Sequence, residues 1–385
     1  MSGLTDRACV TGVGETAYLR GSTRSAFELQ VEASLAAIAD AGLAPRDIDG
    51  VIPIGIVSGI AEDFIDNFAI EDLHFSAVIP HGGASPVMAL QAAASVIASG
   101  ICRHVLIAFG RNVSASANKA GARIHQMPQF HYVTEFEHPL GNSAPAQIYA
   151  PMARRHMELY GTTVEHFGAV AVACREHARL NERAIMKKPI TLEDHRNSRM
   201  IADPFRLLDC SLESDGGAAV VVSAAEAGRD APRPRVLISG VATGHPDSPA
   251  SITQRPDMTS LGLAKAAPRA FRMAGVTQAD IEVAEIYDCF TYAVIRQLED
   301  MGFCAKGEGG PFVADGRLRL GGALPTNTHG GLLSQAHVWG LNHIVELVRQ
   351  LRGEAGAAQV ANARLGLVTG YGDLGDGALA IMRRG

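Results

Sequence analysis

The sequence lacks an excess of positive charge. Its 385 residues carry a net charge of −6 with an isoelectric point near 6.2, and only 19% of them are charged. A protein that binds the phosphate backbone of DNA or RNA needs a basic stripe, which this composition does not provide. We therefore expect no nucleic-acid partner, and an anionic substrate would have to meet a local basic patch.

Long apolar runs and a leader are also lacking. No uninterrupted apolar run approaches the roughly 18 residues that a membrane helix needs. The first ten residues, MSGLTDRACV, do not show the charged and then apolar stretches of a secretory leader. These features predict a cytoplasmic protein with no membrane partner.

Motifs for metals and cofactors are incomplete. The six cysteines form no CxxC pair, which argues against a zinc ribbon or a redox dithiol. Residues 12–16, GVGET, lack the rest of a GxGxxG dinucleotide motif. His125, His131 and His138 have the spacing of neither HExxH nor a zinc finger. We expect no metal, and no cofactor beyond what a substrate itself carries.

Short apolar runs alternate with helical patterns, which is typical of an α/β protein. The segment GRDAPRPR (residues 228–235) separates two such series, so we predict an N-terminal half over residues 1–230 and a C-terminal half over 231–385. Residues 111–160, rich in His, Asn, Gln and Pro, predict an irregular lid or substrate loop. Helices are expected over residues 25–41, 85–99, 163–184, 261–273, 292–301 and 339–351.

One turn stands out as a place for a reactive side chain. A strand-like run at residues 76–80 leads through HGGASP into an Ala-rich helical pattern. Such a strand–turn–helix presents one side chain and several backbone N–H groups at a helix N-terminus. The residue there is Gly83, which has no side chain to act as a nucleophile.

The C-terminal third carries four motifs: YDCF at 287–290, TNTHGG at 326–331, AHV at 336–338 and YGDLGDG at 371–377. Together with the HGGASP turn, they resemble the thiolase superfamily over nearly the whole chain, in particular the sterol-carrier-protein-type thiolases. The resemblance implies a thiolase fold, in which two similar α/β halves form five layers, α-β-α-β-α, with two mixed sheets, one per half.

In such thiolases, four loops supply two cysteines and two histidines. The resemblance puts Gly83 at the nucleophilic cysteine, Tyr287 at the histidine of the His-Asp-Cys-Phe loop, and Tyr371 at the second cysteine. His337 keeps the histidine of the Gly-His-Pro loop. Two cysteines and one histidine of the family pattern are therefore replaced.

Acid–base groups and oxyanion donors without a nucleophile suffice for retro-aldol cleavage of a β-hydroxyacyl-CoA into a ketone or aldehyde and a shorter acyl-CoA. A second resemblance, to the thiolase-like aldolases of bacterial steroid side-chain degradation, agrees, although those usually carry a tyrosine in place of His337. We expect Tyr287 to be the base and His337 to stabilise the enolate. Tyr371 and Asp288 complete the catalytic set. A pocket-wall role for Tyr371, and a helix N-cap role for Asp288 at Thr291, fit the sequence equally well.

Further residues are expected to line the substrate and CoA site, because they flank these motifs. They are His81, Gly83, Asn327, Gly330, Gly331 and Gly372. His343 is expected to be buried and hydrogen-bonded within a helix, and the role of His329 is left open.

The resemblance also implies assembly partners. It predicts at least a homodimer, with the strand near Ile79 paired across a two-fold axis, and a separate small partner built from a zinc ribbon and an OB-fold. Two other functions remain open, namely thiolase-type acyl transfer and a non-catalytic subunit that binds acyl-CoA. A cysteine placed at Gly83 is expected to restore acylation.

Overall fold

The computed structural model describes residues 3–55, 59–113, 133–142, 144–248, 252–372 and 374–385. Its main strands are β1 Ala8–Glu15, β2 Gly50–Pro53, β3 Phe75–Ser76, β4 His104–Arg111, β7 Gly216–Ala224, β8 Val236–Gly244, β9 Val283–Glu285, β10 Leu365–Tyr371 and β11 Gly377–Arg384. A small hairpin joins β5 Met200–Ala202 and β6 Phe205–Arg206. The α-helices are α1 Ala26–Asp40, α2 Ala61–Phe68, α3 Ser85–Ala98, α5 Pro145–Tyr160, α6 Val164–Ala178, α7 Leu192–Asn197, α8 Leu263–Ala274, α9 Thr291–Asp300, α10 Gly309–Ala314, α11 Gly331–Ser334 and α12 Leu341–Arg352.

The nine main strands follow the order β3-β2-β4-β7-β1-β8-β11-β10-β9. The second half repeats the first in mirror order, because β8, β9, β10 and β11 take the places of β1, β2, β4 and β7. β1 and β8 are hydrogen-bonded over two residue pairs, Cys9 with Leu237 and Val10 with Val236. The expected two sheets are thus joined along one edge, and the proposed boundary near residue 230 lies between β7 and β8.

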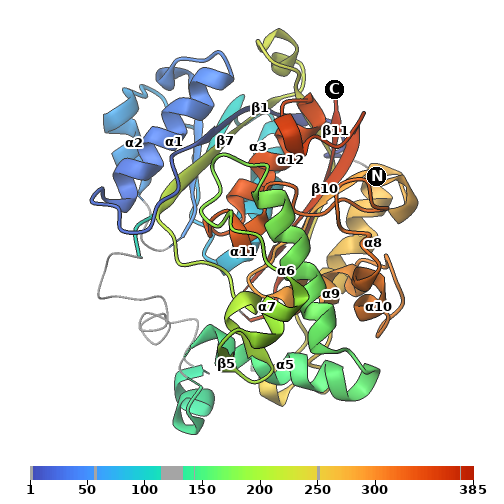
Figure 1. The fold of residues 1–385 in the computed structure, drawn as a ribbon. Helices are drawn as coiled ribbons and strands as arrows, with labels where there is room; N and C mark the ends of the chain where they lie inside the picture. The colour runs from blue at the N-terminus through green and yellow to red at the C-terminus, as the bar shows by residue number, and fades with distance from the viewer. Residues whose placement is uncertain (1–2, 56–58, 114–132, 143, 249–251, 373) are drawn as a thin grey trace.

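The contacts between helices and strands show which helices form the outer layers and which form the middle layer. α1 packs on β1, β4 and β7, and α8 packs on β8 and β11, so each covers the outer face of one half. α3 and α12 contact strands of both halves and each other, and therefore form the middle layer (Figure 1). This is the five-layer arrangement expected of a thiolase fold. Because α3 is covered from both sides, its Ala-rich sequence is buried almost all round.

Two strands carry glycines where an outer helix approaches closely. A Cβ on Gly12 or Gly14 of β1 would lie 2.0 or 2.1 Å from a backbone oxygen of α1. Gly240 and Gly244 of β8 stand in the same relation to the α8 side, with 2.3 and 2.0 Å. The GVGET stretch therefore serves helix–strand packing, in agreement with the incomplete dinucleotide motif.

The predicted lid is only partly irregular. Residues 114–132 of that range lie outside the described residues. Residues 145–160, expected to be irregular, form the helix α5, whose buried residues include Tyr149, Met152 and His156. Their spacing of three and four residues places them on one face. The next helix, α6, ends at Ala178 rather than near residue 184.

Candidate active site

The phenol of Tyr287 fills the space beside Gly83. A Cβ on Gly83 would lie 2.0 Å from Cζ of Tyr287 and 2.3 Å from its hydroxyl oxygen. A Cβ on Gly340 would also collide with this ring, at 2.8 Å from Cδ2 of the tyrosine. Two glycines thus make room for one buried aromatic ring, and the phenol occupies the place where the resemblance puts a cysteine side chain.

Tyr287 and His337 meet at this point. The hydroxyl of Tyr287 lies 3.2 Å from Nε2 of His337, within hydrogen-bond distance. The other ring nitrogen, Nδ1, lies 3.1 Å from Oγ of Ser211. The backbone N–H of His337 donates to Ser214 Oγ at 2.7 Å, and its carbonyl accepts from Arg111 at 3.1 Å. The imidazole is therefore fixed through both its ring and its backbone.

His337 is kept in its neutral form. Burial, followed by the positive potential of Arg111, lowers the pKa of His337 well below its ordinary value. A neutral imidazole has one N–H donor and one lone pair, and the hydroxyl of Ser211 can pair with Nδ1 in either role. His337 can therefore either donate to Tyr287 or accept its proton.

The backbone around Tyr287 is held by side chains. Its N–H donates to Thr369 Oγ1 at 2.9 Å, and its carbonyl accepts from Gln297 Nε2 at 2.7 Å. The preceding residue, Ile286, exchanges two hydrogen bonds with the side-chain amide of Asn327. Asn327, which is buried with φ 55°, therefore holds the segment that carries Tyr287.

Asp288 is a structural anchor in this conformation. It is buried, and its carboxylate accepts from the N–H groups of Leu332 and Leu333 at the start of α11 and lies 3.1 Å from His343 Nε2. A Cβ on Gly331 would lie 2.0 Å from this carboxylate, which explains the glycine. The N-cap role expected at Thr291 is wrong, because Asp288 caps α11 and the N-cap of α9 is Phe290.

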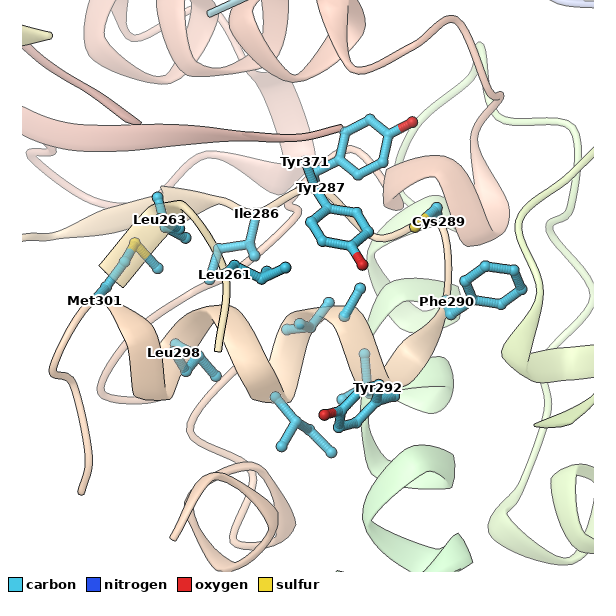
Figure 2. Packing of buried hydrophobic residues seen from close by; sticks show 14 of the residues in the cluster. Leu261, Leu263, Ile286, Tyr287, Cys289, Phe290, Tyr292, Leu298, Met301 and Tyr371 are labelled. Atoms are coloured by element: carbon cyan, nitrogen blue, oxygen red, sulfur yellow. The ribbon is translucent and has the colours of Figure 1, made fainter. Parts of the chain in front are cut away.

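Tyr371 lies next to Tyr287 in an aromatic wall. Figure 2 shows the rings of Tyr287 and Tyr371, whose centroids are 6.4 Å apart. The ring of Tyr149, on α5, lies 5.6 Å from that of Tyr371. Burial raises the pKa of Tyr371 well above its ordinary value, so its hydroxyl stays protonated at neutral pH. Cys289, which stands beside these rings in the figure, is also buried.

The expected binding residues fall into two groups. Gly330 faces Ala178 of α6, and together with Asn327 and Gly331 it shapes the turn behind Tyr287. His81 and Gly372 lie together at a more exposed edge, because a Cβ on Gly372 would lie 2.9 Å from the carbonyl oxygen of His81. The residues of the first group therefore shape the backbone behind Tyr287, whereas His81 and Gly372 lie at the exposed edge of the candidate site.

His81 belongs to a histidine–carboxylate group at that edge. Its Nδ1 lies 3.4 Å from Asp376, which also contacts Nδ1 of His245 at 2.7 Å. The hydrogen bond to Asp376 raises the pKa of His81. With 41% of its side chain exposed, His81 is accessible to solvent.

Sequence reasoning missed several contributors to this site. Ser211 and Ser214 hold His337, Arg111 holds its carbonyl, and Asp376 and His245 complete the group around His81. These residues are distant from their partners along the chain and follow no spacing rule. The SLES stretch before the Gly-Gly turn of β7 was the available signal for the two serines.

Within the described ranges, no three His, Cys, Asp or Glu side chains are grouped so as to hold a metal ion. None of the helices in that part of the chain is both long and apolar enough to cross a membrane.

The chain is similar to several known proteins. Residues 244–382 match the family model described as thiolase C-terminal domain-like. The chain is 41% identical to a steroid side-chain-cleaving aldolase of Thermomonospora curvata, with 92% of each chain covered. It is 40% identical to the 17-hydroxy-3-oxo-4-pregnene-20-carboxyl-CoA lyase of Mycobacterium tuberculosis, over 91% of this chain and 92% of the other. The solved structure of an Ltp2-ChsH2(DUF35) aldolase superposes with a TM-score of 0.92 at 38% identity, covering 100% of this chain and 99% of that one.

Proposed function

The chain belongs to the thiolase superfamily, and we propose that it is an aldolase that cleaves a β-hydroxyacyl-CoA by a retro-aldol reaction. The products are a ketone or aldehyde and a shorter acyl-CoA. The reaction needs no cofactor, because coenzyme A is part of the substrate. No acyl-enzyme forms, since the position of the nucleophile is a glycine.

The contact between Gly83 and Tyr287 carries this proposal. A thiolase needs a thiolate that takes the acyl group. Here a phenol occupies that space, and it lies 3.2 Å from an imidazole nitrogen. A phenol–imidazole pair can move a proton, which is what the cleavage of a β-hydroxyl compound requires.

The roles of the catalytic residues follow from that chemistry. Tyr287 passes its phenolic proton to the Nε2 lone pair of neutral His337 as it accepts the proton of the β-hydroxyl. The Cα–Cβ bond breaks, its electron pair moves into the thioester enolate, and the β-carbon becomes a carbonyl. The Nε2–H that His337 has gained stabilises the enolate oxygen. Tyr371, which is protonated in the resting enzyme, supplies a proton to Cα and regains one as His337 loses its own, and Asp288 acts only by holding the loop.

The substrate class is supported by the named relatives and by the edge of the site. The mycobacterial relative is named for a substrate that carries both a hydroxyl and a CoA thioester. We place an acyl-CoA with a bulky apolar skeleton, such as a steroid, against the aromatic wall of Tyr149 and Tyr371. His81, Gly83 and Gly372 border the thioester end.

Partners and location are proposed on the same basis. The similar aldolase structure pairs Ltp2 with a DUF35 protein, and we propose a partner of that kind here, with a zinc ribbon and an OB-fold. A homodimer paired near Ile79 and a cytoplasmic location complete the proposal.

The test is product analysis with purified protein, alone and with a DUF35 partner, supplied with a β-hydroxyacyl-CoA. A carbonyl compound and an equal amount of shorter acyl-CoA are expected in mass spectra. Acyl transfer to added CoA would instead support a thiolase-type acyltransferase. Binding without turnover in the presence of the partner would support a non-catalytic acyl-CoA-binding subunit. Either result would overturn the proposal.

A further inference from the structure

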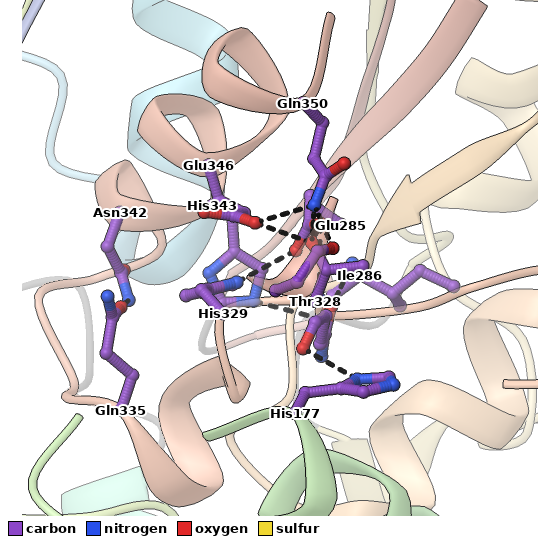
Figure 3. Close-up of polar contacts among 12 residues, drawn as sticks. His177, Glu285, Ile286, Thr328, His329, Gln335, Asn342, His343, Glu346 and Gln350 are labelled. Atoms are coloured by element: carbon purple, nitrogen blue, oxygen red, sulfur yellow. Dashed lines mark hydrogen bonds and ion pairs between the residues drawn. The ribbon is translucent and has the colours of Figure 1, made fainter. Parts of the chain in front are cut away.

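Two buried carboxyl groups meet behind the catalytic strand end (Figure 3). Thr328 Oγ1 lies 2.8 Å from Oε1 of Glu285 and 2.7 Å from Oε1 of Glu346. Glu285 has no exposed surface and Glu346 has 5%. One threonine hydroxyl therefore bridges two glutamates from different elements, the strand β9 and the helix α12.

The two hydrogen bonds of this bridge require two protons, whereas the threonine hydroxyl supplies only one. A hydroxyl has one proton and can donate to only one acceptor, whereas an ionised carboxylate can only accept. Both distances are those of O–H···O hydrogen bonds. Gln350 Nε2 also faces the hydroxyl, at 2.9 Å, and its amide is oriented by Val360 N–H and the carbonyl of Ala358. The threonine hydroxyl can donate to one of the two carboxyl groups, so the other must carry a proton and donate to the hydroxyl oxygen.

The charged surroundings agree with a retained proton. Burial raises the pKa of Glu285 to about 8, and burial followed by the charge of Glu285 raises the pKa of Glu346. His329 Nδ1 lies 3.0 Å from Oε2 of Glu285, and burial lowers the pKa of this histidine, so it stays neutral. Arg349, on the same helix as Glu346, forms its ion pair with Glu15.

We propose that Glu285 and Glu346 share one proton across Thr328, and that this shared proton holds in place the strand end that presents Tyr287. Both glutamates are positioning residues. The effect on turnover rests on the proposed aldolase activity, whereas the shared proton does not.

The connection to Tyr287 runs through adjacent backbone. Glu285 and Tyr287 flank Ile286, whose N–H and carbonyl are bonded by Asn327, the neighbour of Thr328. His343 Nε2 lies 3.2 Å from the same carbonyl and also contacts Asp288. Loss of the proton would place two negative charges against one hydroxyl, push β9 away from the 327–328 turn and shift the phenol relative to His337.

Stability measurements test the shared proton directly. Since the folded pKa of Glu285 lies above its ordinary value, stability should fall as the pH rises from about 5 through about 8. Glu285→Gln and Glu346→Gln each replace a carboxyl by a neutral amide that can donate to Thr328. Each variant should match the wild-type Tm near pH 5, equal or exceed it near pH 7, and lose most of the alkaline fall.

Glu299→Gln is the matched control, because Glu299 is also buried but is bonded to His156 and lies 3.4 Å from Lys306. This variant should lower Tm at neutral pH, since a buried ion partner is lost. The proposal is overturned if Glu285→Gln and Glu346→Gln lower Tm near pH 7 as Glu299→Gln does. It is equally overturned if both keep the wild-type alkaline fall.

Two further measurements keep the proposal testable if the glutamine variants do not fold. The infrared spectrum of the wild-type protein should contain the carbonyl stretch of a protonated carboxyl group that is lost near pH 8, and its absence at neutral pH would overturn the proposal. Thr328→Val should lower kcat about tenfold with little change in KM, since it displaces the strand end, and Thr328→Ser should restore it. Tm and infrared spectra need no substrate, so they separate failure of this proposal from failure of the proposed activity.

Discussion

Gly83→Ala should be strongly unfavourable although it adds one methyl group. The φ of Gly83 is outside the left-handed region, so an alanine meets no backbone strain there. The new Cβ would lie 2.0 Å from Cζ of Tyr287, whereas real Cβ contacts are not shorter than 3.0 Å. The ring must move by about 1 Å, although it is also packed closely against Gly340. Overpacking of this kind costs about 1–3 kcal/mol of stability.

A double-mutant cycle isolates the contact. Tyr287→Ala removes the ring and should itself cost about 3–5 kcal/mol, as for other large aromatic truncations. In that background Gly83→Ala meets no ring and should cost close to nothing. The coupling energy should therefore be about 1–3 kcal/mol.

The assay is urea unfolding of the wild type, the two single variants and the double variant. Gly3→Ala serves as the control, because a Cβ on Gly3 meets nothing within 4 Å. Additive losses would refute the inferred packing of Tyr287 against Gly83. The same contact corrects the expectation that Gly83→Cys alone restores acylation, since a cysteine cannot fit unless Tyr287 is also replaced by a smaller residue.

Three further variants test the roles at the site. Tyr287→Phe keeps the ring but removes its hydroxyl and should lower kcat by about 10²–10⁴-fold, and near wild-type turnover would remove this residue from the mechanism. His337→Ala should lower kcat by about 10²–10³-fold, and the double variant should lose less than the product of the two effects because both act on one transition state. Asp376→Asn should bring the pKa of His81 down toward its ordinary value in an NMR titration, because a hydrogen bond from His81 to this carboxylate raises it; an unchanged titration would contradict the contact.

Much of the fold could be predicted because its elements carry regular apolar patterns. α1, α3 and α12 lie within two residues of the expected ranges at each end. α5 was missed because Pro151 and several polar residues interrupt its pattern, and only tertiary contacts reveal its buried face. The junction of β1 with β8 was also missed, since strand pairing between halves leaves no local signal.

At the site, the sequence named candidate residues but not how they contact one another. Gly83 and Tyr287 were recognised separately, as two replacements of family residues. Their complementary shapes could not be inferred, because they lie about 200 positions apart and meet only through the fold. The serine that contacts the ring of His337 is 126 positions away from it and follows no motif. Such side-chain partners become visible only in three dimensions.

Carbon–carbon cleavage without an acyl-enzyme is tested most directly by turnover of a β-hydroxyacyl-CoA in the absence of free CoA. The intact mass of the protein is followed during the reaction. We predict formation of a carbonyl product and a shorter acyl-CoA at a rate independent of added CoA, with no change in protein mass. A requirement for free CoA, together with a mass increase of one acyl group, would contradict it.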